Sequence, residues 1–176
     1  MALLITQPGV LGSPLSLDMS SKQPDHPILR QWEKLRDRPG GKRLFSWKIG
    51  RYARYTGTIG ARVVELEPGY AKVRMQDRPG LRNHLQSIHA VALANLGELT
   101  TGLAMTVAMP PHARGIPTRL TLEYVKKARG EITAEARCEL PDGREPQTHE
   151  ARADLVDAAG DVVARAVAEW LVGPKP

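Results

Sequence analysis

The chain has 176 residues, of which 41% are apolar and 25% are charged, so it is long enough to bury a full hydrophobic core. This composition excludes a disordered or collagen-like chain, and the lone Cys138 excludes an internal disulfide framework and a cysteine zinc cluster. The net charge of +6 lies entirely in residues 1–55, whereas residues 56–176 hold fifteen Lys/Arg and fifteen Asp/Glu. The local basic excess and the scarcity of aromatic residues argue against a nucleic-acid partner.

The N-terminal part is predicted to form two segments ahead of the main domain. Residues 1–24 show no helical period and no secretory signal pattern, so we expect a flexible or loosely docked arm and a cytoplasmic protein. From Asp25, Pro27 and the spacing of Ile28, Trp32 and Leu35 predict a short helix that ends near residues 39–41. Residues 44–55 mix aromatic and basic side chains without a period. Residues 25–55 are therefore expected to form a basic helical extension.

Alternation of apolar residues predicts a strand pair after residue 56. Ile59, Ala61 and Val63 share one face, residues 68–69 make a turn, and residues 71–75 alternate again. The segment from Ile88 to Met105 is then apolar nearly all round, which predicts one long helix. Its length would span a membrane, but its polar residues, glycines and single charge favour a helix buried in a protein core.

Four more strands are predicted after this helix, at 119–124, 131–140, 149–157 and 161–172. The second of them alternates apolar and charged residues without a break, which is typical of an antiparallel sheet with one buried and one wet face. Residues 56–176 are therefore expected to form one α+β domain, an antiparallel sheet wrapped around one long central helix.

The residues before and within the predicted helix resemble those of a known family. The run Asn83-His84-Leu85-Gln86-Ser87-Ile88-His89-Ala90-Val91, followed by Glu98, is similar to the Asn, His and helix carboxylate of the PaaI-like acyl-CoA thioesterases, which have the hotdog fold. The stretch from Tyr124 to Ala128 is similar to a strand end of the same family. The resemblance covers roughly residues 56–172 and implies the hotdog fold.

The sequence also departs from the family pattern. Gln86 stands where many members have Gly, and Ala90-Val91 replaces the pair of glycines that follows the His. The serine or threonine that some members carry after the helix has no clear counterpart, Thr118 being only nearby. These departures point to a less characterised branch of the superfamily and keep a non-catalytic protein open as an alternative.

The residues and the resemblance together suggest a site around the start of the helix. A carboxylate in an apolar helix tends to have a raised pKa, so Glu98 is expected to act as general base or nucleophile. The backbone N–H of Ala90 lies in the first helical turn and matches the family's oxyanion donor. Asn83 either positions water or the carbonyl or caps the loop. His89 is expected to contact substrate, with a structural alternative, because the His of the family mainly shapes the loop.

Further residues are expected to contact substrate, each with a purely structural alternative. Asn95 either lines the cleft or bonds to backbone. Arg82 or the cluster of Lys126 and Lys127 either binds the phosphates of coenzyme A or forms a solvated turn. The histidines show no metal-ligand spacing, so neither a metal nor a cofactor is expected.

The leading hypothesis is an acyl-CoA thioesterase that hydrolyses its substrate to a free acid and CoA. The second is a hotdog protein that binds an acyl or CoA ligand without turnover, and the third is a hotdog hydratase or dehydratase, whose longer His and Asp signature is not found. The family builds its site between subunits, so we expect a dimer or tetramer with a continuous sheet, and no membrane partner.

Overall fold

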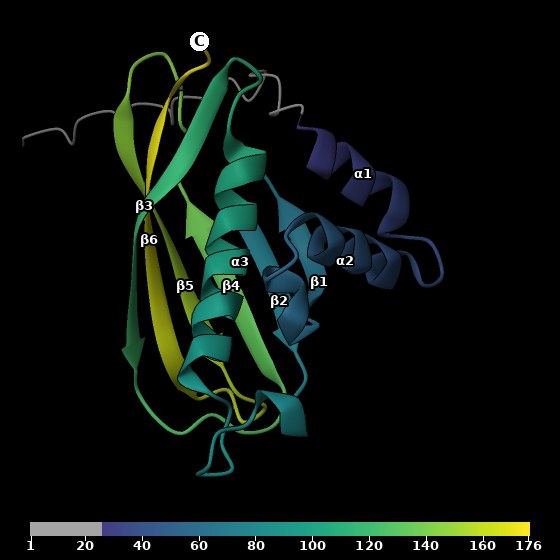
Figure 1. The fold of residues 1–176 in the computed structure, drawn as a ribbon. Coiled ribbons are helices and arrows are strands. Elements are labelled where there is room, and N and C mark those ends of the chain that lie inside the picture. The colour runs from purple at the N-terminus through teal and green to yellow at the C-terminus, as the bar shows by residue number, and fades with distance from the viewer. Residues whose placement is uncertain (1–25) are drawn as a thin grey trace, which may run out of the picture.

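A six-stranded antiparallel sheet wraps around the central helix α3, with two further helices beside it (Figure 1). The computed structural model describes residues 26–176, so the predicted N-terminal arm lies outside the described residues. The sheet order is β1-β2-β4-β5-β6-β3. The elements are α1 (Pro27–Leu35), α2 (Gly41–Tyr52), the 3-10 turn η1 (Thr56–Ile59), β1 (Arg62–Glu67), β2 (Tyr70–Met75), the 3-10 turn η2 (Pro79–Leu81), α3 (Ala90–Ala108), β3 (Ala113–Tyr124), β4 (Ile132–Cys138), β5 (Gln147–Val156) and β6 (Val162–Pro174).

The predicted fold class and the order of strand, strand, long helix and four strands are confirmed. Several details differ from the prediction. Ile59 belongs to η1 and not to a strand, because Gly60 turns the chain with φ +63°. The long helix begins two residues later than predicted, because the side chain of His89 caps it and Ile88 instead pairs with Arg82 in an isolated β-bridge. The helix α2 fills the stretch for which no period was found.

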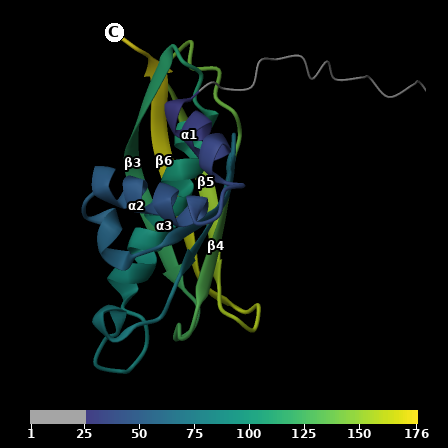
Figure 2. The same cartoon turned by 90° about the vertical axis from the view of Figure 1, so that its right-hand side faces the viewer.

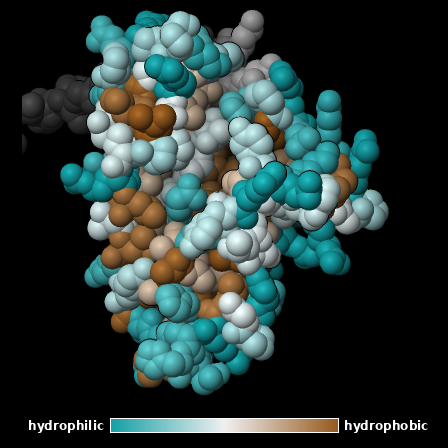
Figure 3. Space-filling model, viewed as in Figure 1, coloured by the Kyte–Doolittle hydropathy of each residue, from teal (hydrophilic) through white to brown (hydrophobic). Residues whose placement is uncertain are grey.

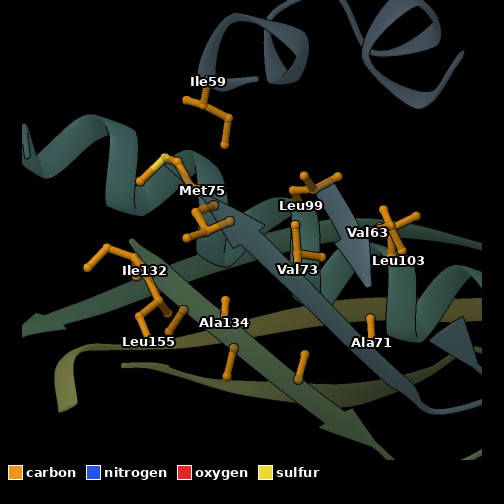
Figure 4. Packing of buried hydrophobic residues seen from close by; sticks show 14 of the residues in the cluster. Ile59, Val63, Ala71, Val73, Met75, Leu99, Leu103, Ile132, Ala134 and Leu155 are labelled. Atoms are coloured by element: carbon orange, nitrogen blue, oxygen red, sulfur yellow. The ribbon is translucent and has the colours of Figure 1, made fainter. Parts of the chain in front are cut away.

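The inner face of the sheet is lined largely by alanines, which lets α3 approach it closely. Three successive inward positions of β6 are Ala164, Ala166 and Ala168, and all of them are buried. A Cβ added to Gly97 of α3 would lie 2.7 Å from the Cβ of Ala166, so the helix touches the sheet with its backbone at this point. Figure 4 shows larger side chains from α3, β2 and β4, among them Leu99, Val73 and Ile132, in the same buried cluster. The apolar α3 is therefore a core helix, although its length and composition alone would allow a membrane span.

The outer face of the sheet carries charged pairs between neighbouring strands. Lys72 on β2 contacts Glu135 on β4 at 2.6 Å. Arg165 on β6 contacts Glu123 on β3 at 3.1 Å and Asp154 on β5 at 3.6 Å. The outer face is thus the wet face that the alternation in residues 131–140 predicts.

The two helices α1 and α2 lie on the same side of the sheet as α3 (Figures 1 and 2). Trp32 of α1 and Phe45 of α2 are buried, and their rings meet edge to face with 5.2 Å between the ring centres. Side chains of α2 also satisfy the backbone of the edge strand β1, since Ser46 Oγ accepts from the Val63 N–H and Lys42 Nζ donates to the Val64 carbonyl at 2.8 Å. Helix α2 therefore covers one edge of the sheet.

The opposite edge of the sheet is formed by β3 and is not covered by the described chain. This strand pairs only with β6, and beyond Ala113 its residues are exposed or partly exposed. Its inward residues include Leu120, which is 38% exposed, and Tyr124, which is 49% exposed. A long strand edge with exposed apolar residues is a site at which another chain can pair.

The close contact at Gly97 predicts opposite effects of one added methyl group at two positions on α3. Gly97→Ala should lower the free energy of unfolding by about 1–3 kcal/mol, because the Cβ must force the helix away from Ala166. At Gly102 the nearest atoms to an added Cβ are 3.7 Å away, which is an ordinary contact. Gly102→Ala should therefore raise the free energy of unfolding, by up to ~1 kcal/mol, through helix propensity. Denaturant unfolding of both variants measures the difference, and equal stabilities would contradict the close packing.

Candidate active site

One stripe of α3 remains uncovered by the sheet and by the N-terminal helices. Its residues recur every three or four positions and are exposed or partly exposed, while most of the remaining helix surface is buried. On this side of the molecule the space-filling view shows brown apolar patches over the region of β3 and α3, whereas the region of α1 and α2 is mostly teal (Figure 3). The stripe consists of Val91, Ala94, Glu98, Gly102 and Thr106.

Glu98 is the only charged residue in α3, and it lies in the middle of the uncovered stripe. Its side chain has no hydrogen-bond or ion-pair partner within residues 26–176. Burial raises the pKa of the Glu98 carboxyl, because the surrounding apolar groups disfavour the charged form. A half-buried carboxylate without a partner is suited to accept a proton or to attack an electrophile.

Trp170 on β6 provides a second unpaired polar group on the same side of α3. The residue is only 8% exposed, and its indole N–H has no acceptor among the described residues. Trp170 Cζ2 and Glu98 Oε1 each lie 3.7 Å from the point where a Cβ on Gly102 would stand. Glycine at position 102 therefore leaves open space between the carboxylate and the indole.

Sequence reasoning missed Trp170. The signal available was the inward run of β6, in which Trp170 follows three alanines at every second position. A large aromatic residue among small inward residues marks a place where the sheet is not in close contact with the helix. That its N–H lacks an acceptor is a property of the three-dimensional packing and has no sequence signal.

The start of α3 is organised by His89 and Tyr124. The Nδ1 atom of His89 accepts from the Val91 N–H at 3.1 Å, which makes His89 the N-cap residue. The Tyr124 hydroxyl on β3 donates to the Ala90 carbonyl at 3.1 Å. The Ala90 N–H has no acceptor in the described part of the chain, and the positive end of the helix dipole is at this position. Ala90 therefore offers a free donor for a developing negative charge.

Asn83 holds together the loop that precedes α3. Its Oδ1 accepts from the Leu85 N–H at 2.9 Å and from the Ser87 hydroxyl at 3.2 Å. The loop includes Gln86 at φ +54°, the left-handed region that favours glycine, which fits the glycine that the resembling family has there. The side-chain oxygen of Asn83 is thus occupied by hydrogen bonds within its own loop, and only the side-chain NH2 group is left to face a ligand.

Three of the expected substrate contacts are engaged in structural interactions. The buried Asn95 donates from Nδ2 to the Tyr55 carbonyl at 3.3 Å, so it bonds to backbone of the N-terminal extension, as its structural alternative predicted. Arg82 pairs with Asp77 at 2.8 Å. Lys126 contacts Asp157 at 2.7 Å and Asp161 at 2.6 Å.

Paired in this way, Arg82 and Lys126 carry little free positive charge. Lys127 is exposed and has no partner in the described part of the chain. Of the predicted phosphate contacts, only Lys127 is therefore free to meet an anion. No group of three His, Cys, Asp or Glu side chains within residues 26–176 is placed to hold a metal.

The predicted donor and the predicted base are not brought together within one chain. Ala90 and Glu98 are eight residues apart on the same straight helix. At 1.5 Å per residue, the two groups are separated by about 12 Å along the helix axis, too far to act on one carbonyl group. A site that uses both groups needs the Glu98 of one chain and the Ala90 of another.

The comparisons agree with this fold. The chain has the hotdog fold that is found in the PaaI-like thioesterases. It belongs to the family described as a domain of unknown function, DUF4442, whose profile matches residues 41–172. No curated protein matches the sequence significantly.

Three solved structures are similar to this chain. A structural-genomics protein, APC5556, is 28% identical with a TM-score of 0.74, over 84% of this chain and 99% of that one. Protein PA5026 from Pseudomonas aeruginosa, described as a "probable thioesterase", is 26% identical with a TM-score of 0.66, over 76% of this chain and 94% of that one. PaaI from the phenylacetic acid degradation operon of E. coli is 18% identical with a TM-score of 0.57, over 72% and 91%, and shares the fold alone.

The raised pKa of Glu98 predicts how stability depends on pH. Folding raises the pKa of the Glu98 carboxyl above its value in the unfolded chain. Burial of this carboxyl therefore costs no stability below the unfolded pKa, where the group is protonated in both states, and stability is lost as pH rises through the folded pKa. Glu98→Gln removes the charge, so its free energy of unfolding should exceed that of the wild type by an amount that grows as pH rises above the ordinary carboxyl pKa of about 4.3 and becomes constant above the raised pKa of Glu98. Denaturant unfolding across this range, with the exposed Glu67→Gln as control, measures the difference. A difference that is constant over the whole range would show that burial does not perturb Glu98.

Proposed function

We propose that this protein hydrolyses an acyl thioester, with acyl-CoA as the substrate class. The observation that carries the proposal is the unpaired, half-buried Glu98 on the uncovered stripe of α3, beside the unpaired N–H of Trp170. The similarity to a "probable thioesterase" and the hotdog fold support the same reaction class. An apolar stripe next to the carboxylate suits an acyl chain, since it allows the chain to leave water.

In the proposed reaction Glu98 acts on a water molecule or directly on the thioester carbonyl. As a base, its carboxylate takes a proton from water while the water oxygen bonds to the carbonyl carbon. The carbonyl oxygen becomes an oxyanion, which the free N–H of Ala90 and the helix dipole stabilise. The carbon–sulfur bond then breaks, and the proton passes from Glu98 to the leaving thiolate, so that water and thioester become acid and thiol.

The separation of Ala90 from Glu98 requires that the site be shared between two chains. The open edge of β3 is the surface proposed to pair, because the described chain leaves it without a partner. Pairing there would extend the sheet and bring the uncovered stripes of two α3 helices together. We therefore propose a dimer, or a tetramer made of two dimers, in which each site combines Glu98 of one subunit with Ala90 of the other.

A non-catalytic acyl-binding or CoA-binding protein is the second candidate. Two observations favour it: Ala90-Val91 replaces the glycine pair of the resembling family, and Val91 projects from the stripe with 51% of its surface exposed. A side chain at this position narrows the approach to the Ala90 N–H. Measured turnover of a thioester separates this candidate from the enzyme.

Removal of the Glu98 charge tests the chemistry. Glu98→Gln keeps the shape of the side chain but cannot take a proton, so thioester turnover should fall by about 10²-fold or more while acyl-CoA binding survives. Release of free thiol from a panel of acyl-CoAs, together with calorimetric binding, measures both quantities. Glu67→Gln, on the edge strand β1, is the matched control and should retain turnover. Full hydrolysis by a folded Glu98→Gln protein would refute the role of Glu98, and binding without turnover by the wild type would establish the second candidate.

Removal of the Ala90 donor tests the shared site. Ala90→Pro deletes the N–H at the first helical position, where proline is tolerated, and the extended His89 (ψ 138°) is compatible with a following proline. Turnover should fall by about 10²-fold or more through loss of the oxyanion donor. Co-expression of Ala90→Pro with Glu98→Gln should then restore activity to about a quarter of wild type. About half of the randomly assembled dimers are mixed, and each mixed dimer contains one intact site of two.

Two results would contradict this arrangement. Mixed dimers without recovered activity would place both groups of each site in the same chain. A wild-type protein that sediments as a monomer at micromolar concentration while turning over substrate would exclude a shared site altogether.

A further inference from the structure

A second concave region lies on the other side of α3, between α2 and the edge strand β1. This groove has a volume of about 1180 Å³ and is lined by α2, the turn η1, β1 and the end of β2. Leu99 of α3 contributes to its wall, whereas its neighbour Glu98 does not. The groove is therefore separate from the stripe proposed for thioester hydrolysis.

The groove carries a dense positive charge. Residues 38–64 contain seven Lys/Arg and no Asp/Glu. Glu131 is the one carboxylate among the described lining residues, and it already contacts Arg74 at 3.7 Å and the Gln76 amide. The cationic lining residues are Lys42, Arg43, Arg51, Arg54, Arg62 and Arg74.

Three of the arginines at the groove are not neutralised by the described part of the chain. Within residues 26–176, Arg43, Arg54 and Arg62 contact no carboxylate. On the outer face of the sheet, by contrast, Lys72 and Arg165 are each paired with acidic residues of neighbouring strands. Uncompensated like charges repel one another, so a cluster that the chain leaves unpaired in a concave region favours an anionic ligand.

An aromatic side chain accompanies these cations. Trp47 lines the groove and is 59% exposed, although tryptophan normally buries most of its surface. The Arg51 guanidinium lies 5.4 Å from the centre of the Trp47 ring. A planar cation beside an exposed indole offers a platform on which an aromatic base can stack.

The floor of the groove is fixed by the packing of α2 on β1. Lys42 Nζ and Ser46 Oγ are used to satisfy the backbone of β1, so neither is available to a ligand. Gly50 and Gly57 bring α2 and η1 into backbone contact, since a Cβ on Gly57 would lie 2.5 Å from the Gly50 carbonyl oxygen. The arginines therefore project from a rigid frame, which lowers the entropic cost of binding.

We propose that this groove binds a nucleotide that carries two or more phosphate groups. Arg43, Arg54 and Arg62 hold the phosphates through charge-assisted hydrogen bonds, and the Trp47–Arg51 pair stacks against the base. A single aromatic residue in a concave region suits one nucleotide, whereas binding of single-stranded nucleic acid uses a series of stacking residues along a track. The exposed Leu44 and Tyr52, which a lipid surface would contact, are not among the groove residues.

Direct binding to the full chain tests this proposal independently of hydrolysis. Calorimetry at low salt with ADP, adenosine 3′,5′-bisphosphate, CoA, pyrophosphate and adenosine separates the contributions of phosphates and base. We expect both nucleotides to bind more tightly than pyrophosphate or adenosine, with affinity that falls as salt rises. If CoA binds as tightly as adenosine 3′,5′-bisphosphate, the ligand of the groove is the nucleotide end of CoA. If CoA binds more weakly, the ligand is a free nucleotide.

Substitutions at the groove assign the binding to its residues. The double variant Arg54→Gln/Arg62→Gln should bind the nucleotides at least tenfold more weakly than the wild type. A tenfold change corresponds roughly to the loss of one charge-assisted hydrogen bond. Trp47→Ala should reduce the affinity for ADP but not for pyrophosphate. Lys34→Gln/Arg144→Gln removes two exposed charges outside the groove and should stay within about twofold of the wild type. Thermal unfolding confirms that each variant is folded.

Three results would overturn the proposal. The first is absence of nucleotide binding by the folded wild-type protein, whether or not it hydrolyses thioesters. The second is equal loss of affinity in the groove variant and in the Lys34→Gln/Arg144→Gln control. The third is binding to vesicles of anionic phospholipid or to single-stranded DNA without binding to nucleotides.

Discussion

The close contact between α3 and the alanine-lined face of the sheet governs the rest of the structure. At Gly97 the helix backbone reaches the methyl group of Ala166, and no larger side chain fits between them. Small residues on both surfaces let the sheet curve tightly around the helix, so the apolar helix is covered on most sides without bulky core residues. The same curvature leaves one stripe of the helix uncovered, because β3 ends the sheet before it encloses the helix completely.

The two edges of this sheet are treated differently, and the difference determines where a partner can bind. At β1 the side chains of Ser46 and Lys42 satisfy the strand backbone, and α2 covers the edge. At β3 the described chain provides no such cover. An antiparallel sheet with one protected and one open edge pairs with a copy of itself without forming an extended fibre, since the pairing closes after two subunits.

Much of the fold was predictable because its signals are local. The alternation in residues 131–140 and the apolar run around Leu96 follow from side-chain periodicity within one element, and both predictions are confirmed. The bounds of helix α2 were not predictable, because it fully buries only Gly41 and Phe45, so its apolar residues show no regular spacing. The strand assignment of Ile59 was wrong, because an alternation of apolar residues continues across a turn that Gly60 ends.

The candidate site shows the same limit. Glu98 could be identified from sequence because a charge in an apolar helix is visible there. The pairing of Lys126 with Asp157 and Asp161 could not, since more than thirty residues separate the partners and only the strand arrangement brings them together. The unpaired state of the Trp170 N–H likewise depends on which side chains surround it in space.

The distribution of unpaired charge distinguishes structural from functional surfaces in this protein. On the outer face of the sheet, cross-strand pairs such as Lys72 with Glu135 neutralise charges that serve only solubility and register. Glu98 and three of the groove arginines, Arg43, Arg54 and Arg62, have no such partners within residues 26–176, and each such group costs stability through desolvation or repulsion. Evolution tolerates such a cost where a ligand supplies the missing partner. The carboxylate on one side of α3 and the arginines on the other therefore define two surfaces of opposite charge, suited to different parts of a substrate or to different ligands.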